Sequence, residues 1–309
     1  MSLGILFPGQ GSQSIGMVAD LYSDFKVVSE IFSEASDILS DDLWKVVKKG
    51  PNEKINDTRY TQPIMLCACY SIWKIWKDEG GDTPIFFAGH SFGEYTALVA
   101  ADSLKFKDAV KLVRERSRLM CETQPGTMAA IIGLEYKNIE EIIKKNNLSD
   151  EVSVANINAP GQTVISGSEK AVKSISSKCL KSGAKKSIEL PVSVPAHSIL
   201  MKEASSNYIE FINKIKLLEP KIPVINNVDV KHETEENKIK NALIRQISSP
   251  VRWVEIIEYM SQQGVNVLLE LGPGKILTSL NKRIDSTIDS LYVSDIKSLE
   301  NALEITNNI

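Results

Sequence analysis

The strongest candidate for chemistry in this chain is a serine held between two glycines. The motif Gly89-His90-Ser91-Phe92-Gly93 follows an apolar segment, residues 85–88, that is typical of a buried strand, and a helical pattern follows it. This strand–turn–helix context is the one in which such a motif forms a nucleophile elbow, a strained turn that lifts the serine hydroxyl out of a sheet. The N-terminus of the next helix also favours a developing negative charge. The motif therefore predicts covalent catalysis through Ser91.

A serine hydroxyl needs a base to accept its proton, and the chain offers three histidines. His90 adjoins the serine and would have to fold back within the same sharp turn. His232 lies in a polar run, residues 231–236, that is typical of a solvated loop. His197 remains as the candidate base.

Apolar patterns predict an α/β domain around these residues. A strand at Leu3–Phe7 runs into a glycine-rich turn at residues 8–13, and further strands are expected at 85–88, 223–226 and 267–271. Helices are expected at 61–76, 94–101, 106–120 and 238–247.

The pattern of predicted elements changes between about Pro125 and Pro195. Strand and helix patterns alternate there in the order β-α-β-β-α-β, which is the ferredoxin-like signature. We therefore expect a small inserted domain at 125–195 and a large domain composed of residues 1–124 and 196–309. A length of 309 residues suits one large domain with a smaller one inserted.

Composition excludes several classes of protein. With a net charge of -3, the protein has no overall positive potential that would attract nucleic acid. No apolar run is long enough to cross a bilayer, and the N-terminus lacks the pattern of a signal peptide, so we expect a cytoplasmic protein without membrane contact. Cys67 and Cys69 have no zinc-site spacing and are expected to be buried thiols.

Five motifs, in order, resemble those of the malonyl-CoA:acyl carrier protein transacylase family. They are Pro8-Gly9-Gln10-Gly11-Ser12-Gln13, Gly89-His90-Ser91-Phe92-Gly93-Glu94, the arginine of Val113-Arg114-Glu115-Arg116, Pro195-Ala196-His197-Ser198, and Gln246 before Pro250-Val251. The resemblance covers nearly the whole chain. Together with the elbow, it implies a large α/β-hydrolase-like domain with a parallel sheet and an inserted small ferredoxin-like domain.

The resemblance also implies the catalytic residues. Ser91 and His197 would form a dyad without a third carboxylate, and a carbonyl oxygen at Gln246 would hold the imidazole proton on one nitrogen. The backbone N–H groups of Gln10 and Phe92 would form the oxyanion hole. For Gln10 taken alone, a structural glycine-rich turn is the competing interpretation.

Arg116 corresponds to the arginine that receives the free carboxylate of malonyl in this family. A planar guanidinium suits that task because it can donate two parallel hydrogen bonds. Without the resemblance, Arg114, Arg116 and Arg118 would all be interpreted as solvated charges on one helix.

The implied activity is transfer of malonyl from malonyl-CoA to the phosphopantetheine thiol of acyl carrier protein, by a ping-pong mechanism that supplies fatty-acid biosynthesis without a cofactor. Three alternatives stay open: a serine esterase or thioesterase, a trans-acting acyltransferase of polyketide synthesis, and a non-catalytic interaction protein. We expect a monomer.

Two sequence features bear on substrate and partner. Phe92 stands where leucine is usual in the family, which leaves the backbone donor intact but could narrow the mouth of the pocket. The cluster Lys178, Lys181, Lys185 and Lys186 could form part of a docking face for an acidic carrier protein. A solvated helix end is the alternative interpretation of these lysines.

Overall fold

The protein is represented by a computed structural model that describes residues 2–192 and 194–307, and it contains two sheets of different kinds. The main sheet has five parallel strands in the order β7-β2-β1-β8-β9. These strands are β1 (Leu3–Phe7), β2 (Phe86–Gly89), β7 (Val224–Ile225), β8 (Val267–Leu271) and β9 (Asp289–Val293). Strand β1 lies at the centre, and its last residue, Phe7, pairs with Gly89 of β2 directly before the elbow.

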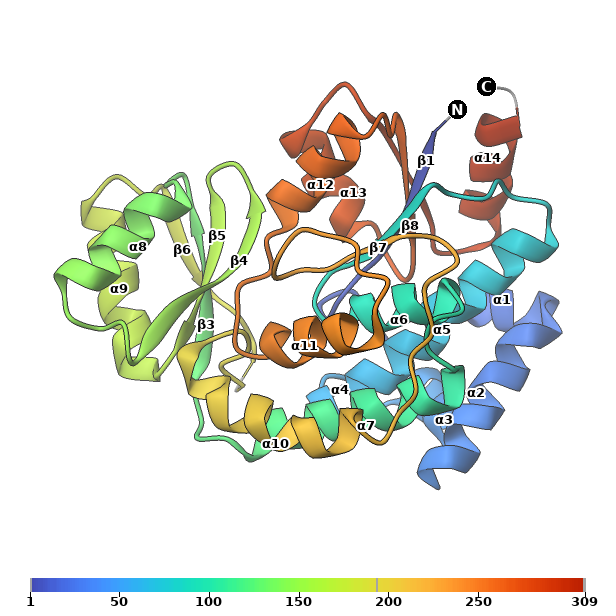
Figure 1. The fold of residues 1–309 in the computed structure, drawn as a ribbon, viewed down its shortest axis with the longest axis horizontal. Helices are drawn as coiled ribbons and strands as arrows, with labels where there is room; N and C mark the ends of the chain where they lie inside the picture. Colours follow the sequence, from blue (N-terminus) through green and yellow to red (C-terminus); the bar gives the residue numbers. More distant parts are fainter. Residues whose placement is uncertain (1, 193, 308–309) are drawn as a thin grey trace.

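Helices cover both faces of the main sheet (Figure 1). Alternate residues of the strands point to opposite faces, so Ile5 and Phe7 pack against one helical layer and Leu6 against the other. The first layer contains α1 (Ala19–Asp24), α2 (Lys26–Leu39), α3 (Leu43–Lys49), α4 (Asn52–Ile55), α5 (Thr58–Asp78), α6 (Gly93–Ala100), α7 (Phe106–Glu122), α10 (Lys202–Ile212), α11 (Glu236–Gln246) and α14 (Ile296–Asn307). The second contains α12 (Trp253–Gln262) and α13 (Ile276–Ile284).

The second sheet is antiparallel and stands to one side of the main sheet (Figure 1). Its strands are β3 (Thr127–Ile132), β4 (Val152–Ala159), β5 (Gln162–Gly167) and β6 (Lys186–Glu189), in the order β4-β5-β3-β6. With α8 (Tyr136–Lys145) and α9 (Glu169–Lys181), the chain order is β-α-β-β-α-β, as predicted. The fold class expected from the sequence is confirmed, whereas the domain boundaries at 125 and 195 stay a prediction.

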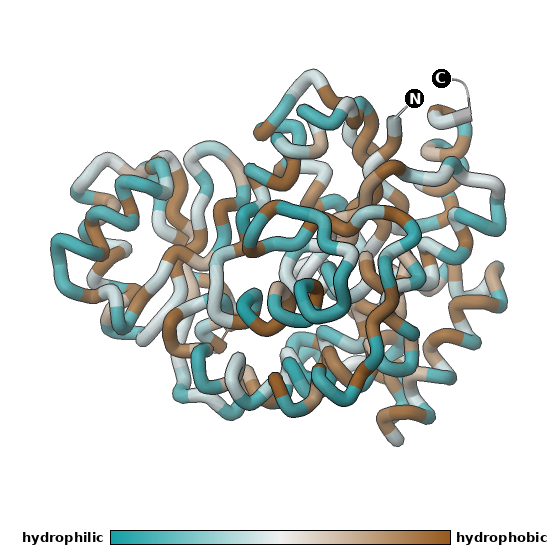
Figure 2. The backbone as a smooth tube through the Cα atoms, viewed as in Figure 1, coloured by the Kyte–Doolittle hydropathy of each residue, from teal (hydrophilic) through white to brown (hydrophobic). Residues whose placement is uncertain are grey.

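The two faces of this small sheet have different partners. Ala129 and Ile131 pack against the helices α8 and α9, whereas Met128 and Ala130 point to the opposite face, where Ala196 packs against them. Figure 2 shows hydrophobic residues concentrated on the strands of the small unit and hydrophilic residues on the outer turns of its helices. The face that carries Met128 is therefore free to border a cleft toward the main sheet.

Most predicted elements lie within a few residues of their expected ends. Strand β3 ends at Ile132, because Gly133 takes a φ of +87° that a strand does not allow. Cys67 and Cys69 are fully buried in α5, as predicted, and burial raises the pKa of both thiols.

Candidate active site

The turn that carries Ser91 depends on its two flanking glycines. Ser91 has a φ of +54°, the strained left-handed conformation typical of an elbow. A Cβ on Gly89 would lie 1.9 Å from the carbonyl carbon of Gly93, and a Cβ on Gly93 would lie 2.4 Å from the carbonyl oxygen of Phe7. Only glycine fits at both positions, and their absence of side chains lets the turn sit against the end of β1.

Ser91 and His197 form a hydrogen-bonded pair. The Ser91 Oγ lies 2.7 Å from His197 Nε2. The other ring nitrogen, Nδ1, lies 2.8 Å from the backbone oxygen of Gln246 and 3.1 Å from that of Ser249. Carbonyl oxygens only accept, so Nδ1 carries the proton and Nε2 is left to accept the serine proton. The carbonyl of Gln246 thus occupies the orienting position that a carboxylate has in a triad.

The imidazole of His197 is only 2% exposed. Burial lowers the pKa of His197 to about 3, and the nearby Arg116 cation contributes in the same direction. The neutral form predominates above this pKa, so Nε2 carries a free lone pair throughout the physiological range.

We expect His197 to stay neutral well below the usual pKa of a histidine. In an NMR titration from pH 8 to pH 5, its ring should keep the chemical shifts of the neutral form with the proton on Nδ1, because protonation requires a pH close to the lowered pKa. The three ring signals can be assigned by comparison with a His197→Gln variant. A titration midpoint near pH 6.5 for this ring would show that the site does not suppress its protonation.

Arg116 reaches the serine from α7. It is 1% exposed, and its Nη2 donates to Ser91 Oγ at 3.2 Å and to Gln246 Oε1 at 3.1 Å. Its Nε donor is buried without a hydrogen-bond partner in the described part of the chain. Burial lowers the pKa of Arg116, but an arginine side chain remains charged in a protein. The site therefore contains a buried cation with unused hydrogen-bonding capacity beside the nucleophile.

The two predicted oxyanion donors lie at the ends of neighbouring strands. Gln10 follows β1 and Phe92 follows β2, and β1 pairs with β2. Within residues 2–192 and 194–307, neither backbone N–H donates a hydrogen bond to another residue. The Phe92 ring is 1% exposed and belongs to the main core. The effect of this ring on the mouth of the pocket stays a prediction.

These residues line a cleft of about 530 Å³ between the main sheet and the small sheet. The large unit contributes five of the six predicted site residues to this lining, and the sixth, Gln246, is fully buried. The small unit contributes Met128, Asn156 and Val164, of which Met128 and Val164 lie on the sheet face opposite α8 and α9. The structure thus places Gln10, Ser91, Phe92, Arg116 and His197 in one cleft, with Gln246 hydrogen-bonded to Arg116 and His197.

The remaining histidines lie apart from the nucleophile's hydroxyl, as expected. His90 Nε2 is 2.9 Å from the Asn158 Oδ1, so this ring connects the elbow to β4 of the small sheet. His232 is exposed and lies 3.4 Å from the Tyr259 hydroxyl. Neither ring makes a hydrogen bond to the Ser91 hydroxyl.

Sequence reasoning missed two buried residues that surround the elbow. Asn227 is fully buried; its Oδ1 accepts from the Ser91 backbone N–H at 2.7 Å, and its Nδ2 donates to the Gly89 carbonyl at 2.7 Å. Glu94 is 2% exposed and accepts from the Asn227 backbone N–H at 3.0 Å and from Gln246 Nε2 at 2.7 Å. The glutamate is visible in the sequence directly after the serine motif, but the asparagine gave no signal there.

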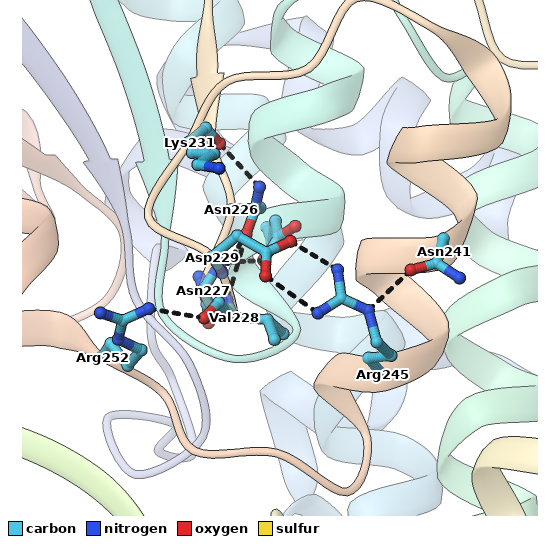
Figure 3. Close-up of polar contacts among 9 residues, drawn as sticks. Asn226, Asn227, Val228, Asp229, Lys231, Asn241, Arg245 and Arg252 are labelled. Atoms are coloured by element: carbon cyan, nitrogen blue, oxygen red, sulfur yellow. Dashed lines mark hydrogen bonds and ion pairs between the residues drawn. The ribbon is translucent and has the colours of Figure 1, made fainter.

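The loop that carries Asn227 is held from both sides (Figure 3). The Asp229 carboxylate pairs with the Arg245 guanidinium on α11, one residue before Gln246, through a 2.9 Å bond from Nη1 and a second from Nη2. Arg252 Nη1 donates to the Val228 carbonyl at 3.0 Å. These contacts fix the loop relative to the helix that provides Gln246.

Two further searches of the described residues bear on the function. No helix in residues 2–192 and 194–307 has the length and apolar character that crossing a membrane demands. In the same residues, no group of three or more histidine, cysteine, aspartate or glutamate side chains is arranged to hold a metal ion.

Comparison with known proteins agrees with the site. Residues 5–302 match the family model described as acyl transferase domain. The malonyl CoA-acyl carrier protein transacylase of Escherichia coli is 45% identical over 303 residues, which cover 97% of this chain and 98% of that protein.

Solved structures of similar proteins share the whole fold. An acyl carrier protein S-malonyltransferase from Vibrio cholerae has a TM-score of 0.94 and 47% identity, covering 97% of this chain and 99% of the other. A malonyl-transacylase in complex with its holo type II PKS acyl-carrier protein has a TM-score of 0.96 and 45% identity, covering 99% and 100%. The resemblance expected from the five motifs is confirmed, and the chain belongs to the malonyl CoA-acyl carrier protein transacylase family.

Proposed function

We propose that this protein transfers malonyl from malonyl-CoA to the phosphopantetheine thiol of an acyl carrier protein, through an ester on Ser91. The observation that carries this proposal is the buried Arg116 guanidinium, whose Nη2 lies 3.2 Å from the nucleophile. Malonyl is an acyl group with a free carboxylate, and a buried cation beside the reacting serine matches that charge.

In the first half-reaction, Ser91 Oγ attacks the thioester carbonyl of malonyl-CoA. His197 Nε2 takes the serine proton as the new C–O bond forms, and the backbone N–H groups of Gln10 and Phe92 stabilise the oxyanion. When the C–S bond breaks, His197 returns the proton to the departing sulfur, and coenzyme A leaves as a thiol. The malonyl group remains as an ester on the serine.

The second half-reaction reverses these steps with another thiol. His197 takes the proton of the phosphopantetheine thiol, whose sulfur attacks the ester carbonyl. The C–O bond then breaks, and the serine oxygen recovers its proton from the imidazole. Because coenzyme A leaves before the carrier protein reacts, the kinetics are ping-pong.

Arg116 separates this function from an ordinary serine hydrolase. The elbow, the base and the oxyanion hole would serve water equally well, but an esterase for neutral acyl groups gains nothing from a buried cation, whose desolvation is costly. The non-catalytic alternative is disfavoured because Ser91 and His197 are within hydrogen-bonding distance and the cleft in front of them is open.

The proposal is tested by initial rates with malonyl-CoA and a holo acyl carrier protein varied together. Parallel lines in a double-reciprocal plot, and coenzyme A release that depends on the carrier protein, are the expected results. Coenzyme A release at the same rate with carrier protein or with water alone would identify a hydrolase. The carrier proteins of fatty-acid and type II polyketide synthesis should be compared, and we propose the fatty-acid carrier as the preferred acceptor.

Several properties of the whole protein belong to the same proposal. The reaction requires only the protein residues named above, so we propose that the enzyme works without a bound cofactor. We also propose a cytoplasmic monomer that meets malonyl-CoA and the carrier protein in solution.

We propose that lysines at one end of the small unit contribute to carrier-protein docking. Lys186 is exposed at the start of β6, Lys185 is exposed directly before it, and Lys181 is exposed at the end of α9. Reversing the charge of Lys185 and Lys186 to glutamate should raise the KM for the carrier protein, more strongly at low salt, because an acidic partner would lose attraction. The rate of Ser91 acylation by malonyl-CoA should not change. An unchanged KM would mean that these lysines only solvate the helix end.

A further inference from the structure

Glu94 is a buried carboxylate for which the reaction steps above have no use. It lies in the first turn of α6, three residues after the nucleophile, and is 2% exposed. Burial raises its pKa to about 7, although two hydrogen bonds and the Arg116 cation act in the opposite direction. A carboxylate in such a place costs stability unless its hydrogen-bonding capacity is used. Its hydrogen bonds go to the Asn227 backbone N–H and to Gln246 Nε2, so an effect of Glu94 on the site passes through these two partners.

The orientation of the Gln246 amide depends on Glu94. The two donors on Gln246 Nε2 point to Glu94 Oε2 at 2.7 Å and to the Ser91 carbonyl at 3.0 Å. Both partners accept hydrogen bonds, so the amide oxygen Oε1 must point the other way, toward Arg116 Nη2 at 3.1 Å. In the flipped orientation, the NH₂ group would face the guanidinium, donor against donor, and the oxygen would face the carboxylate, acceptor against acceptor.

This arrangement connects the buried Glu94 carboxyl group to a buried cation without direct contact. No carboxylate lies within ion-pair distance of Arg116 anywhere in the described residues. The other acidic group that acts on Glu94, Asp229, is itself paired with Arg245. A glutamate touching Arg116 would compete with the carboxylate of the acyl group. An amide between them orients the guanidinium and leaves it able to bind substrate.

A second set of contacts leads from Glu94 to the elbow. Its Oε2 also accepts from the Asn227 backbone N–H, and the Asn227 side chain holds Ser91 and Gly89. Loss of Glu94 could therefore weaken the nucleophile as well as the arginine. The two effects differ in one respect: a disturbed elbow lowers the transfer of every acyl group, whereas a displaced Arg116 affects only acyl groups that carry a carboxylate.

We propose that Glu94 is a positioning residue for the acyl carboxylate: it orients the Gln246 amide, which in turn holds the Arg116 guanidinium beside Ser91. This inference rests on the malonyl transfer proposed above. Its signature is a change in the selectivity ratio, defined as kcat/KM for malonyl-CoA divided by kcat/KM for acetyl-CoA.

The test compares Glu94→Ala and Glu94→Gln in the full-length protein. The alanine variant should lower the selectivity ratio by roughly ten- to a hundredfold, the effect of losing a hydrogen bond to a charged group. The glutamine variant keeps an oxygen that can accept from Gln246 and Asn227 but lacks the charge, so the ratio should fall by only about three- to tenfold. If the alanine variant does not fold, the glutamine variant alone decides, and an unchanged ratio would overturn the inference.

A double-mutant cycle separates the arginine route from general disruption. In an Arg116→Ala background, Glu94→Ala should not change the selectivity ratio further, because the residue through which it acts is gone. A change that persists in that background would contradict the proposal, as would equal losses with both acyl donors in the single variant. If the unaltered protein takes up no malonyl group, the proposed function fails instead.

The chain offers a matched control in a second buried carboxylate. Glu270 is fully buried in β8 and accepts from the Thr278 backbone N–H at 2.7 Å, but it makes no hydrogen bond to Arg116 or Gln246. Glu270→Gln should lower the melting temperature and leave the selectivity ratio unchanged. A shift in the ratio equal to that of Glu94→Gln would mean that loss of any buried charge has this effect.

Discussion

Replacement of His197 with alanine is expected to lower kcat/KM for malonyl transfer by roughly four to six orders of magnitude, the loss seen when the base of a serine nucleophile is removed. The Ser91 hydroxyl donates to Nε2 at 2.7 Å, and no other histidine makes a hydrogen bond to it within the described residues. Without this acceptor, the hydroxyl keeps its proton and attacks slowly. The measurement is a stopped-flow or quench assay of coenzyme A release.

His232→Ala serves as the matched control, since this ring is exposed and remote from the nucleophile. Its kcat/KM should equal that of the unaltered protein. If His197→Ala retains more than about a hundredth of the activity, a loss smaller than general-base removal normally produces, another group must accept the serine proton.

Replacement of Arg116 with alanine is expected to invert the preference between acyl donors. The carboxylate of malonyl would enter a largely dry site without a partner, at a cost of roughly 3–5 kcal/mol, which is about two to three and a half orders of magnitude in kcat/KM. Acetyl-CoA brings no carboxylate and should lose little. Rates of Ser91 acylation by the two thioesters provide the comparison.

Arg116→Lys should recover only part of the malonyl activity, because a point charge replaces a planar fork. Arg118→Ala is the control on the same helix, since Arg118 pairs with Glu115 and Glu122 on the surface. Equal losses of malonyl and acetyl transfer in Arg116→Ala would show that the arginine only supports the fold.

The parts of the fold that the sequence predicted are those with local signals. The elbow combines a buried strand, two glycines and a helix start within about ten residues, and the small sheet repeats its strand and helix patterns in order. The strand expected at 223–226 is shorter than predicted: β7 has only two residues, Val224 and Ile225, because its length is set by pairing with β2. Edge strand β9 is only partly buried and lacks a continuous apolar run.

The parts of the site that sequence reasoning missed depend on contacts between distant segments. Glu94 meets Gln246 across 152 residues, and Asn227 meets Gly89 across 138 residues. Residue type alone does not reveal such contacts, since a glutamate after an elbow is equally consistent with a favourable charge at a helix N-terminus. The resemblance implied a carbonyl oxygen at Gln246, but the role of its side-chain amide became visible only in the structure.

The central claim is that malonyl is carried on Ser91. The most direct measurement is the intact mass of the protein after brief mixing with malonyl-CoA, compared with a Ser91→Ala variant. The account predicts one malonyl adduct on the unaltered protein, which disappears when holo acyl carrier protein is added, and none on the variant. The variant should melt at a similar temperature, because the hydroxyl contributes little to packing. A malonyl mass on Ser91→Ala, or an adduct that water removes as fast as the carrier protein does, would contradict the account.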